Sequence, residues 1–126
     1  MGQFVGEGPR RLLIVEADAE LGETLATFFC ERGYDVTRAA TGLQAIELFR
    51  ARPAGWDFLL TDYDMPGLNG SDLITWCRIW NIALKRAVLL TGGGDVRLKN
   101  REFVSDLGLV ILRKPASLIE LERVMA

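Results

Sequence analysis

The sequence predicts an α/β fold: a doubly wound, five-stranded parallel sheet with helices on both of its faces. Five short apolar runs of strand length alternate along the chain with five helical patterns. Several of the runs are almost continuously apolar, as expected for parallel strands that are buried on both faces. Strands that alternate with helices are typical of a parallel sheet joined by right-handed crossovers. We therefore expect a three-layer α/β/α arrangement.

The predicted elements follow each other without an internal repeat or a low-complexity tract. The strands cover residues 11–15, 34–39, 58–60, 87–91 and 109–112. The helices cover residues 19–32, 42–51, 71–80, 96–107 and 118–125. Asp18 is placed to cap the first helix, and two capping boxes, Thr41 with Gln44 and Ser117 with Glu120, open the second and fifth helices.

Length and composition fit a single domain. The chain has 126 residues, a formal net charge of −2 and no histidine. We expect the glycine-rich residues 1–9 to be a linker or a cloning remnant, and residues 10–126 to form the domain. The near-neutral charge supplies no basic surface for nucleic acid or a membrane, and no apolar run approaches the ~20 residues that span a bilayer. We expect a cytoplasmic protein that binds neither, as a monomer or a weak homodimer.

Four residues are predicted to lie in the core because of their helical spacing. Cys30 and Cys77 both belong to apolar helical patterns, which favours reduced, buried cysteines over a disulfide. Trp76 and Trp80 share one helix face, and a tryptophan pair at this spacing is more often part of a core than of a binding site.

Polar side chains stand at the ends of four predicted strands. Glu16 follows the first strand, Asp62 the third and Lys114 the fifth, and Thr91 ends the fourth. The carboxyl ends of parallel strands lie on one rim, where open α/β sheets bind ligands, so these side chains should converge. Carboxylates suit Mg²⁺, whereas an ammonium and a hydroxyl suit the oxygens of a phosphoryl group. The arrangement predicts phosphoryl transfer to Asp62 as an aspartyl phosphate.

Residues 11–125 resemble the receiver domain of two-component response regulators. The resemblance rests on residues 13–16, 59–70, 89–92 and 113–115, which together are far more specific than any one of them. It implies a flavodoxin-like (βα)5 fold. It also implies a signalling domain rather than an enzyme, which assists its own phosphorylation and dephosphorylation and passes the signal on by a conformational change.

The resemblance also assigns roles to the site residues. It implies that Asp62 accepts a phosphoryl group from a histidine kinase or a histidine phosphotransfer domain, and that Thr91 and Lys114 contact the phosphoryl oxygens. Mg²⁺ would be bound by Glu16, Asp62 and the backbone carbonyl of Asp64. We further expect a cis peptide bond between Lys114 and Pro115, because an X–Pro bond has a trans preference of only about 0.5–1 kcal/mol.

Two positions depart from the family pattern. Ala17 stands where the family usually has a second acidic residue that ligates Mg²⁺ directly, so we expect weak metal binding. Ile111 stands at the family's aromatic switch position, and we expect it to be an ordinary packed strand residue. The segment before the fifth strand is about one residue short, which is similar to receivers of hybrid histidine kinases.

Two other interpretations stay open. The chain can be a pseudo-receiver, a protein-docking module with this fold but without productive phosphorylation, and Ala17 favours that reading. Asp62 and Asp64 also form the Asp-x-Asp pattern of aspartate-nucleophile phosphatases. In those enzymes, however, the pattern follows the first strand, whereas here it follows the third.

Overall fold

The computed structural model describes residues 10–92 and 108–125. Five parallel strands form one sheet in the order β2-β1-β3-β4-β5. The strands are β1 (Arg10–Val15), β2 (Tyr34–Ala39), β3 (Phe58–Asp62), β4 (Arg86–Thr91) and β5 (Leu109–Arg113). The predicted doubly wound fold is confirmed. The expected linker at residues 1–9 and the expected helix at 96–107 lie outside the described residues.

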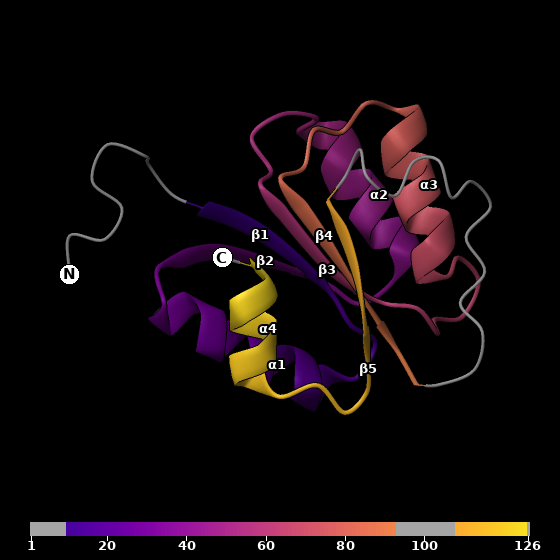
Figure 1. The fold of residues 1–126 in the computed structure, drawn as a ribbon. Helices are drawn as coiled ribbons and strands as arrows, with labels where there is room; N and C mark the ends of the chain where they lie inside the picture. Colours follow the sequence, from indigo (N-terminus) through magenta and orange to yellow (C-terminus); the bar gives the residue numbers. More distant parts are fainter. Residues whose placement is uncertain (1–9, 93–107, 126) are drawn as a thin grey trace.

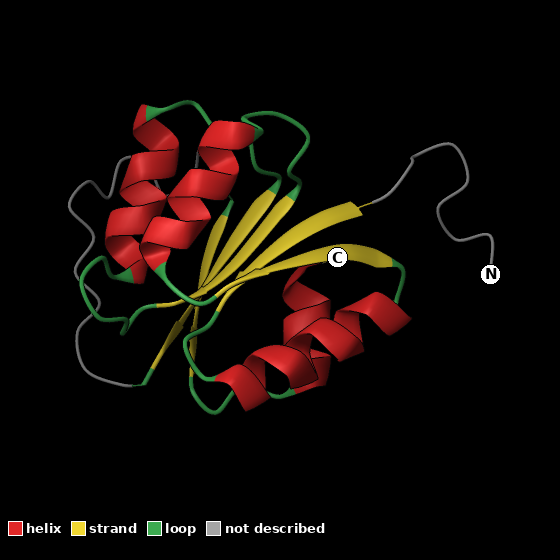
Figure 2. Cartoon of the chain, turned by 180° about the vertical axis from the view of Figure 1, so that it is seen from behind, coloured by secondary structure: helices red, strands yellow, loops and turns green. Residues whose placement is uncertain are grey.

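Helices cover both faces of the sheet. The helices of the described residues are α1 (Ala19–Glu31), α2 (Gly42–Ala51), α3 (Gly70–Ile79) and α4 (Leu118–Met125). Both views show α1 and α4 together on one face and α2 and α3 side by side on the other (Figures 1 and 2). Within the described ranges, no helix is long and apolar enough to cross a membrane.

The sheet separates two hydrophobic cores. One core packs α1 and α4 onto the sheet around Phe29 and Leu121, and the other packs α2 and α3 around Phe49 and Leu73. All five residues of β3 are buried because the strand is central in the sheet and both of its faces are covered. Its last residue, Asp62, is therefore carried on one of the most firmly packed elements of the chain.

The helix starts follow the predicted capping signals. The Asp18 carboxylate accepts hydrogen bonds from two amides in the first turn of α1, at 3.0 and 3.1 Å. The Thr41 hydroxyl accepts one from the amide of Gln44 at 3.1 Å, and Ser117 does the same for Glu120 at 3.1 Å. These side chains satisfy amides that have no partner within the helix.

Three core predictions are wrong. Cys30 is exposed, because the buried residues of α1 are Gly22, Leu25 and Phe29 and Cys30 points away from them. Cys77 is buried as predicted, and both cysteines are free. Burial raises the pKa of the Cys77 thiol to about 12.

The other two errors concern large side chains at the ends or edges of elements. Trp80 is 61% exposed because it is the C-cap of α3, one residue past the last helical turn, and its ring stacks on Trp76. Ile111 is 42% exposed, since it lies on β5, the last strand of the sheet order. Helical or strand spacing alone does not reveal that an element has ended or that a strand lies at an edge.

Candidate functional site

The four predicted site residues lie on the same rim of the sheet. Asp62 is the last residue of β3 and Thr91 the last of β4, and they are 5% and 6% exposed. Glu16 directly follows β1 and is 6% exposed. Lys114 directly follows β5. The parallel sheet therefore brings together residues that lie up to 98 positions apart in the sequence, 114 minus 16.

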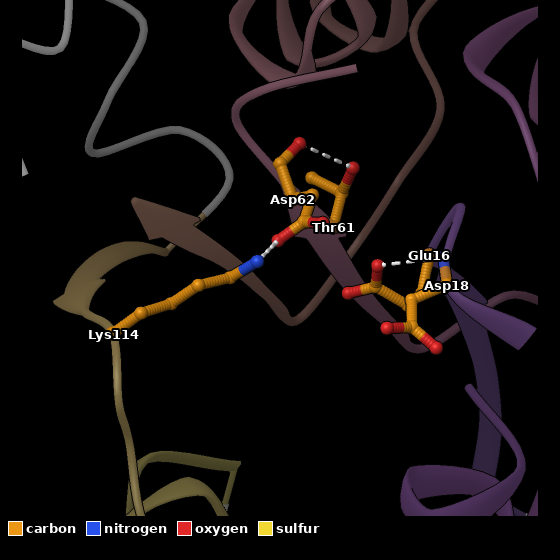
Figure 3. A network of polar contacts seen from close by, with 5 residues as sticks. All are labelled: Glu16, Asp18, Thr61, Asp62 and Lys114. Carbon is orange, nitrogen blue, oxygen red and sulfur yellow. Dashed lines mark hydrogen bonds and ion pairs between the residues drawn. The ribbon is translucent and has the colours of Figure 1, made fainter. Parts of the chain in front are cut away.

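Asp62 and Lys114 form an ion pair across β4. The Lys114 ammonium lies 2.5 Å from Oδ1 of Asp62, and Figure 3 shows the lysine side chain extended toward that carboxylate. The end of β5 is tied to β4 because the Lys114 amide donates a hydrogen bond to the carbonyl of Thr91 at 2.7 Å. The peptide bond between Lys114 and Pro115 is cis, as predicted.

The Lys114 ammonium is held in its charged form. Burial alone would lower its pKa, but the hydrogen bond to Asp62 and the negative charges of Asp62, Glu16 and Asp64 outweigh burial. The net result is a pKa of Lys114 above its usual value. The site therefore contains a positive charge at its centre at every physiological pH.

Glu16 is oriented differently from Asp62. Its Oε2 atom accepts a hydrogen bond from the backbone amide of Asp18 at 3.0 Å, as Figure 3 shows. Burial raises the pKa of the Glu16 carboxyl, the Asp18 amide partly offsets that rise, and the neighbouring Asp62 adds to it. The Glu16 carboxyl group thus lies near the negative charge of Asp62, and two neighbouring acidic groups form a site that favours a cation between them.

Ala17 leaves room beside this carboxyl group. Its side chain is exposed and lines a pocket of about 280 Å³ together with Glu16 and Arg38. The next acidic residue, Asp18, uses its carboxylate to cap α1, as predicted. The β1 end of the site thus has one carboxyl group, where the resemblance leads one to expect two.

Two residues that sequence reasoning did not single out hold Asp62 in place. A Cβ atom on Gly70 would overlap the backbone carbonyl of Asp62, so only glycine lets α3 start this close to the end of β3. The Thr61 hydroxyl donates a hydrogen bond to the same carbonyl at 3.1 Å. The sequence marked Gly70 only as a turn former, because a close approach between two segments has no local sequence signal.

Space is left on the β4 side of the site. Among residues 10–92 and 108–125, a Cβ atom on Gly92 would have one neighbour within 4 Å, Oδ2 of Asp64, at 3.8 Å. Asp64 is exposed and lies two residues after Asp62, in the loop that leads to α3. The room beside Gly92 suits a group that is larger than the side chains present, such as a phosphoryl group on Asp62.

The residues present fit one hard divalent cation, held loosely. Mg²⁺ is usually bound by one or two carboxylates and keeps several waters. Glu16 and Asp62 supply two neighbouring carboxylates, and the Asp64 backbone carbonyl is the third oxygen that the resemblance offers. No cluster of three acidic, histidine or cysteine side chains occurs in the part of the chain that the structure describes. The donor set is therefore adequate but sparse.

Comparisons with known sequences agree with this geometry. The family model of the response regulator receiver domain matches residues 12–125. The probable transcriptional regulatory protein SilR of Salmonella typhimurium and the transcriptional regulatory protein CusR of Escherichia coli (strain K12) are each 34% identical over 113 residues. Each alignment covers 88% of this chain and 47% of the relative, so the chain spans about half the length of these relatives.

Solved structures agree as well. A response regulator receiver domain protein from Clostridium thermocellum superimposes with a TM-score of 0.78 at 22% identity, covering 92% of this chain and 90% of that one. The receiver domain of the hybrid histidine kinase CckA superimposes with a TM-score of 0.72 at 28% identity, covering 90% and 94%. The chain therefore belongs to the response regulator receiver domain family of two-component signalling.

Proposed function

We propose that this receiver accepts a phosphoryl group on Asp62 from a histidine kinase or a histidine phosphotransfer domain. The observation that carries the proposal is the buried Asp62 carboxylate at the end of β3 with the Lys114 ammonium 2.5 Å away. A buried carboxylate at a strand end, with a cation and open space beside it, has the features of an activated nucleophile.

Phosphoryl transfer replaces a P–N bond of the donor by an O–P bond on Asp62. A carboxylate oxygen of Asp62 attacks the phosphorus of a phosphohistidine, so an O–P bond forms and the P–N bond breaks. The electron pair stays on the imidazole nitrogen, which takes up a proton from solvent. Lys114 would stabilise negative charge on the transferred oxygens, and the hydroxyl of Thr91, at the end of the strand beside Asp62, would bind another of them. Later attack by water on the phosphorus returns Asp62 to its carboxylate form.

Glu16, Asp62 and the Asp64 backbone carbonyl are the groups that would hold Mg²⁺. When bound, the ion neutralises charge on the phosphoryl oxygens in the loose transition state. Because the site has one acidic side chain fewer at residue 17, we infer that binding is weak and that the ion is held mainly when a phosphoryl group adds its own oxygens.

The relatives indicate two kinds of protein in which such a domain occurs. SilR and CusR are transcriptional regulatory proteins, whereas the CckA domain belongs to a hybrid histidine kinase. Phosphoacceptance at the strand rim is the property that both settings need. We therefore assign this chain the relay step, in the cytoplasm and as a monomer or a weak homodimer, without direct nucleic-acid binding by residues 10–126.

A pseudo-receiver is the second candidate, and one observation favours it. Ala17 removes a carboxyl group from the metal side of the site. In that case the domain would dock a partner through the same fold without being phosphorylated. The presence of Lys114 in a direct ion pair with Asp62 favours the phosphoacceptor instead, because a docking module has no need of a buried carboxylate and ammonium.

Intact mass spectrometry separates the two candidates. The chain is incubated with a small-molecule phosphodonor, a phosphoramidate, with and without Mg²⁺. A phosphate-sized mass gain that needs Asp62 is expected, and Asp62→Asn should abolish it. Asp35→Asn, on β2 near the end of the sheet opposite to the rim, is the matched control and should still be labelled. Labelling of Asp62→Asn at the original rate would refute the assignment, and no labelling of the unmodified chain would favour the pseudo-receiver.

A further inference from the structure

A second surface with functional features lies at the opposite end of the molecule. Helices α2 and α3 both run against the strands, so their C-terminal ends lie together at the edge where the strands begin (Figure 1). Ile79 and Trp80 at the end of α3 are 64% and 61% exposed. These two neighbouring side chains form an exposed apolar area that a partner can cover.

Trp80 is held in place by a row of aromatic rings. It stacks on Trp76 with a centroid distance of 5.6 Å and an interplanar angle of 24°. Trp76 stacks on the buried Phe49 at 6.1 Å, and Phe49 contacts Trp56 at 5.6 Å. The exposed ring is thus anchored through Trp76 to the core. A ring that is already ordered loses little conformational entropy on binding, which is the property of an interface anchor.

Positive charge lies at the C-terminal end of α2, at the same edge of the sheet. Arg50 lies in the last turn of α2 and Arg52 is its C-cap, and both are exposed. The carbonyl of Arg52 accepts a hydrogen bond from the Trp56 indole at 2.7 Å, which places Arg52 at the start of the aromatic row that ends in Trp80. Neither arginine has a carboxylate partner among residues 10–92 and 108–125. We call Arg50, Arg52, Ile79 and Trp80 the aromatic-basic patch.

The charges decide which kind of partner fits. A symmetric contact between two copies of this chain would bring the arginines of one patch against those of the other, which is unfavourable. A segment with carboxylates would instead neutralise Arg50 and Arg52 and leave Trp80 to contact an apolar side chain. We propose that the aromatic-basic patch is a docking surface for an acidic protein segment that carries a large apolar residue.

The proposal is independent of the phosphoryl chemistry, because the patch lies at the edge of the sheet that is opposite to Asp62. A partner docked there can therefore stay bound whether or not the rim is occupied by a kinase. The receiver would then have two faces for two partners, one that delivers the phosphoryl group and one that holds the domain near its target.

The test is a selection from a random peptide library against the intact chain. Enriched peptides should carry net negative charge and at least one aromatic or leucine side chain, and should bind more weakly as salt is raised. Trp80→Ala should reduce the affinity of the enriched peptides by about tenfold or more. The double variant Arg50→Glu, Arg52→Glu should reduce it by a similar factor and remove the salt dependence.

Matched controls lie away from the patch. Leu43→Ala removes an apolar residue that is 65% exposed at the opposite end of α2, and Arg123→Glu reverses an exposed charge on α4. Both control variants should bind the peptides like the unmodified chain. Ile79→Ser is a second variant within the aromatic-basic patch. Each of four results would overturn the proposal: no enrichment, enrichment of basic or uncharged peptides, equal binding by Trp80→Ala, or self-association of the chain that Trp80→Ala abolishes. Phosphodonor labelling of Asp62 should be unchanged in every patch variant.

Discussion

The two sides of the Asp62 site differ in the charged and polar groups that they contribute. The side formed by β4 and β5 contributes Thr91 and Lys114, and Lys114 pairs directly with Asp62. The side formed by β1 contributes Glu16 alone, and one of its oxygens already accepts a hydrogen bond from the Asp18 amide. The groups expected to bind phosphoryl oxygens are all present, whereas those expected to bind a cation are reduced.

This difference shows that the two tasks of the site are physically separable. In the proposed function, Lys114 and Thr91 would act on the transferred oxygens by charge and hydrogen bonding, and their positions depend on the pairing of β4 with β5. Cation binding depends on the number of carboxylates at the end of β1. A change on one side should therefore alter one task and leave the other nearly intact, and the following experiments test that separation from the largest expected effect to the smallest.

The largest effect is expected from Lys114→Gln on the β5 side. The variant keeps a hydrogen-bond donor but loses the charge beside Asp62, so the rate of phosphodonor labelling should fall on the order of 10²-fold. The measurement is the initial rate of mass gain at saturating Mg²⁺. Lys85→Gln, which changes the lysine paired with Asp57 away from the rim, is the control. A rate within a factor of two of the unmodified chain would show that Lys114 does not act on the phosphoryl group.

The next effect comes from Gly70, which lets α3 pack against the backbone of Asp62 and belongs to neither side of the site. Gly70→Ala would place a methyl group against the Asp62 carbonyl and the Leu89 side chain, so the backbone must shift. We expect the free energy of unfolding to fall by about 1–3 kcal/mol, measured in urea. In Gly92→Ala the same methyl group would lie 3.8 Å from Oδ2 of Asp64, an ordinary contact distance, and should change the stability little. Equal losses in the two variants would contradict the close packing of α3 on β3.

A smaller effect is expected from restoring a carboxylate on the β1 side. Ala17→Asp has room, because Ala17 is exposed beside a pocket of about 280 Å³. Mg²⁺ affinity should rise on the order of tenfold in a calorimetric titration, since the number of carboxylates sets the affinity of such sites. Labelling should become faster at low Mg²⁺ and change little at saturation. Unchanged affinity would mean that Glu16 or Asp18 already supplies the missing ligand.

The smallest effect is a pH dependence that arises from Glu16. Its pKa is raised in the folded state, so the folded chain binds this proton more tightly than the unfolded chain does. The stability from this group is complete below the unfolded pKa of about 4.3 and is lost as the pH rises through the higher folded-state pKa. Without divalent cations, Glu16→Gln should match the unmodified chain near pH 4 and be more stable near pH 7.

Urea unfolding at both pH values measures this difference. Glu47→Gln on the exposed side of α2 gives the background for losing one carboxylate. A Glu16→Gln variant that is less stable than the unmodified chain at neutral pH would show that Glu16 is stabilised as a carboxylate, most simply by its hydrogen bond to the Asp18 amide. The β1 side would then stabilise the charged form of its group, Glu16, just as the β5 side stabilises the charged form of Lys114.

Local sequence signals predicted the order of the elements and the identity of the rim residues. Apolar runs and the alternating residues 34–39 marked the five strands, and a polar residue marked the end of four of them, because a charged side chain does not continue into the buried part of the sheet. Asp18, Thr41 and Ser117 marked the helix starts. Their short side chains accept hydrogen bonds from backbone amides within three residues. These features depend on neighbours in the chain, so one sequence is enough to find them.

Only the tertiary structure decided which residues meet and which are exposed. The pairing of Lys114 with Asp62 depends on β5 lying next to β4, and the need for glycine at residue 70 depends on how closely α3 approaches β3. Trp80 and Cys30 have the spacing of core residues but lie on the surface, because burial is set by where a helix ends and which face meets the sheet. Such contacts join segments that are far apart in the chain, so a local sequence pattern does not predict them.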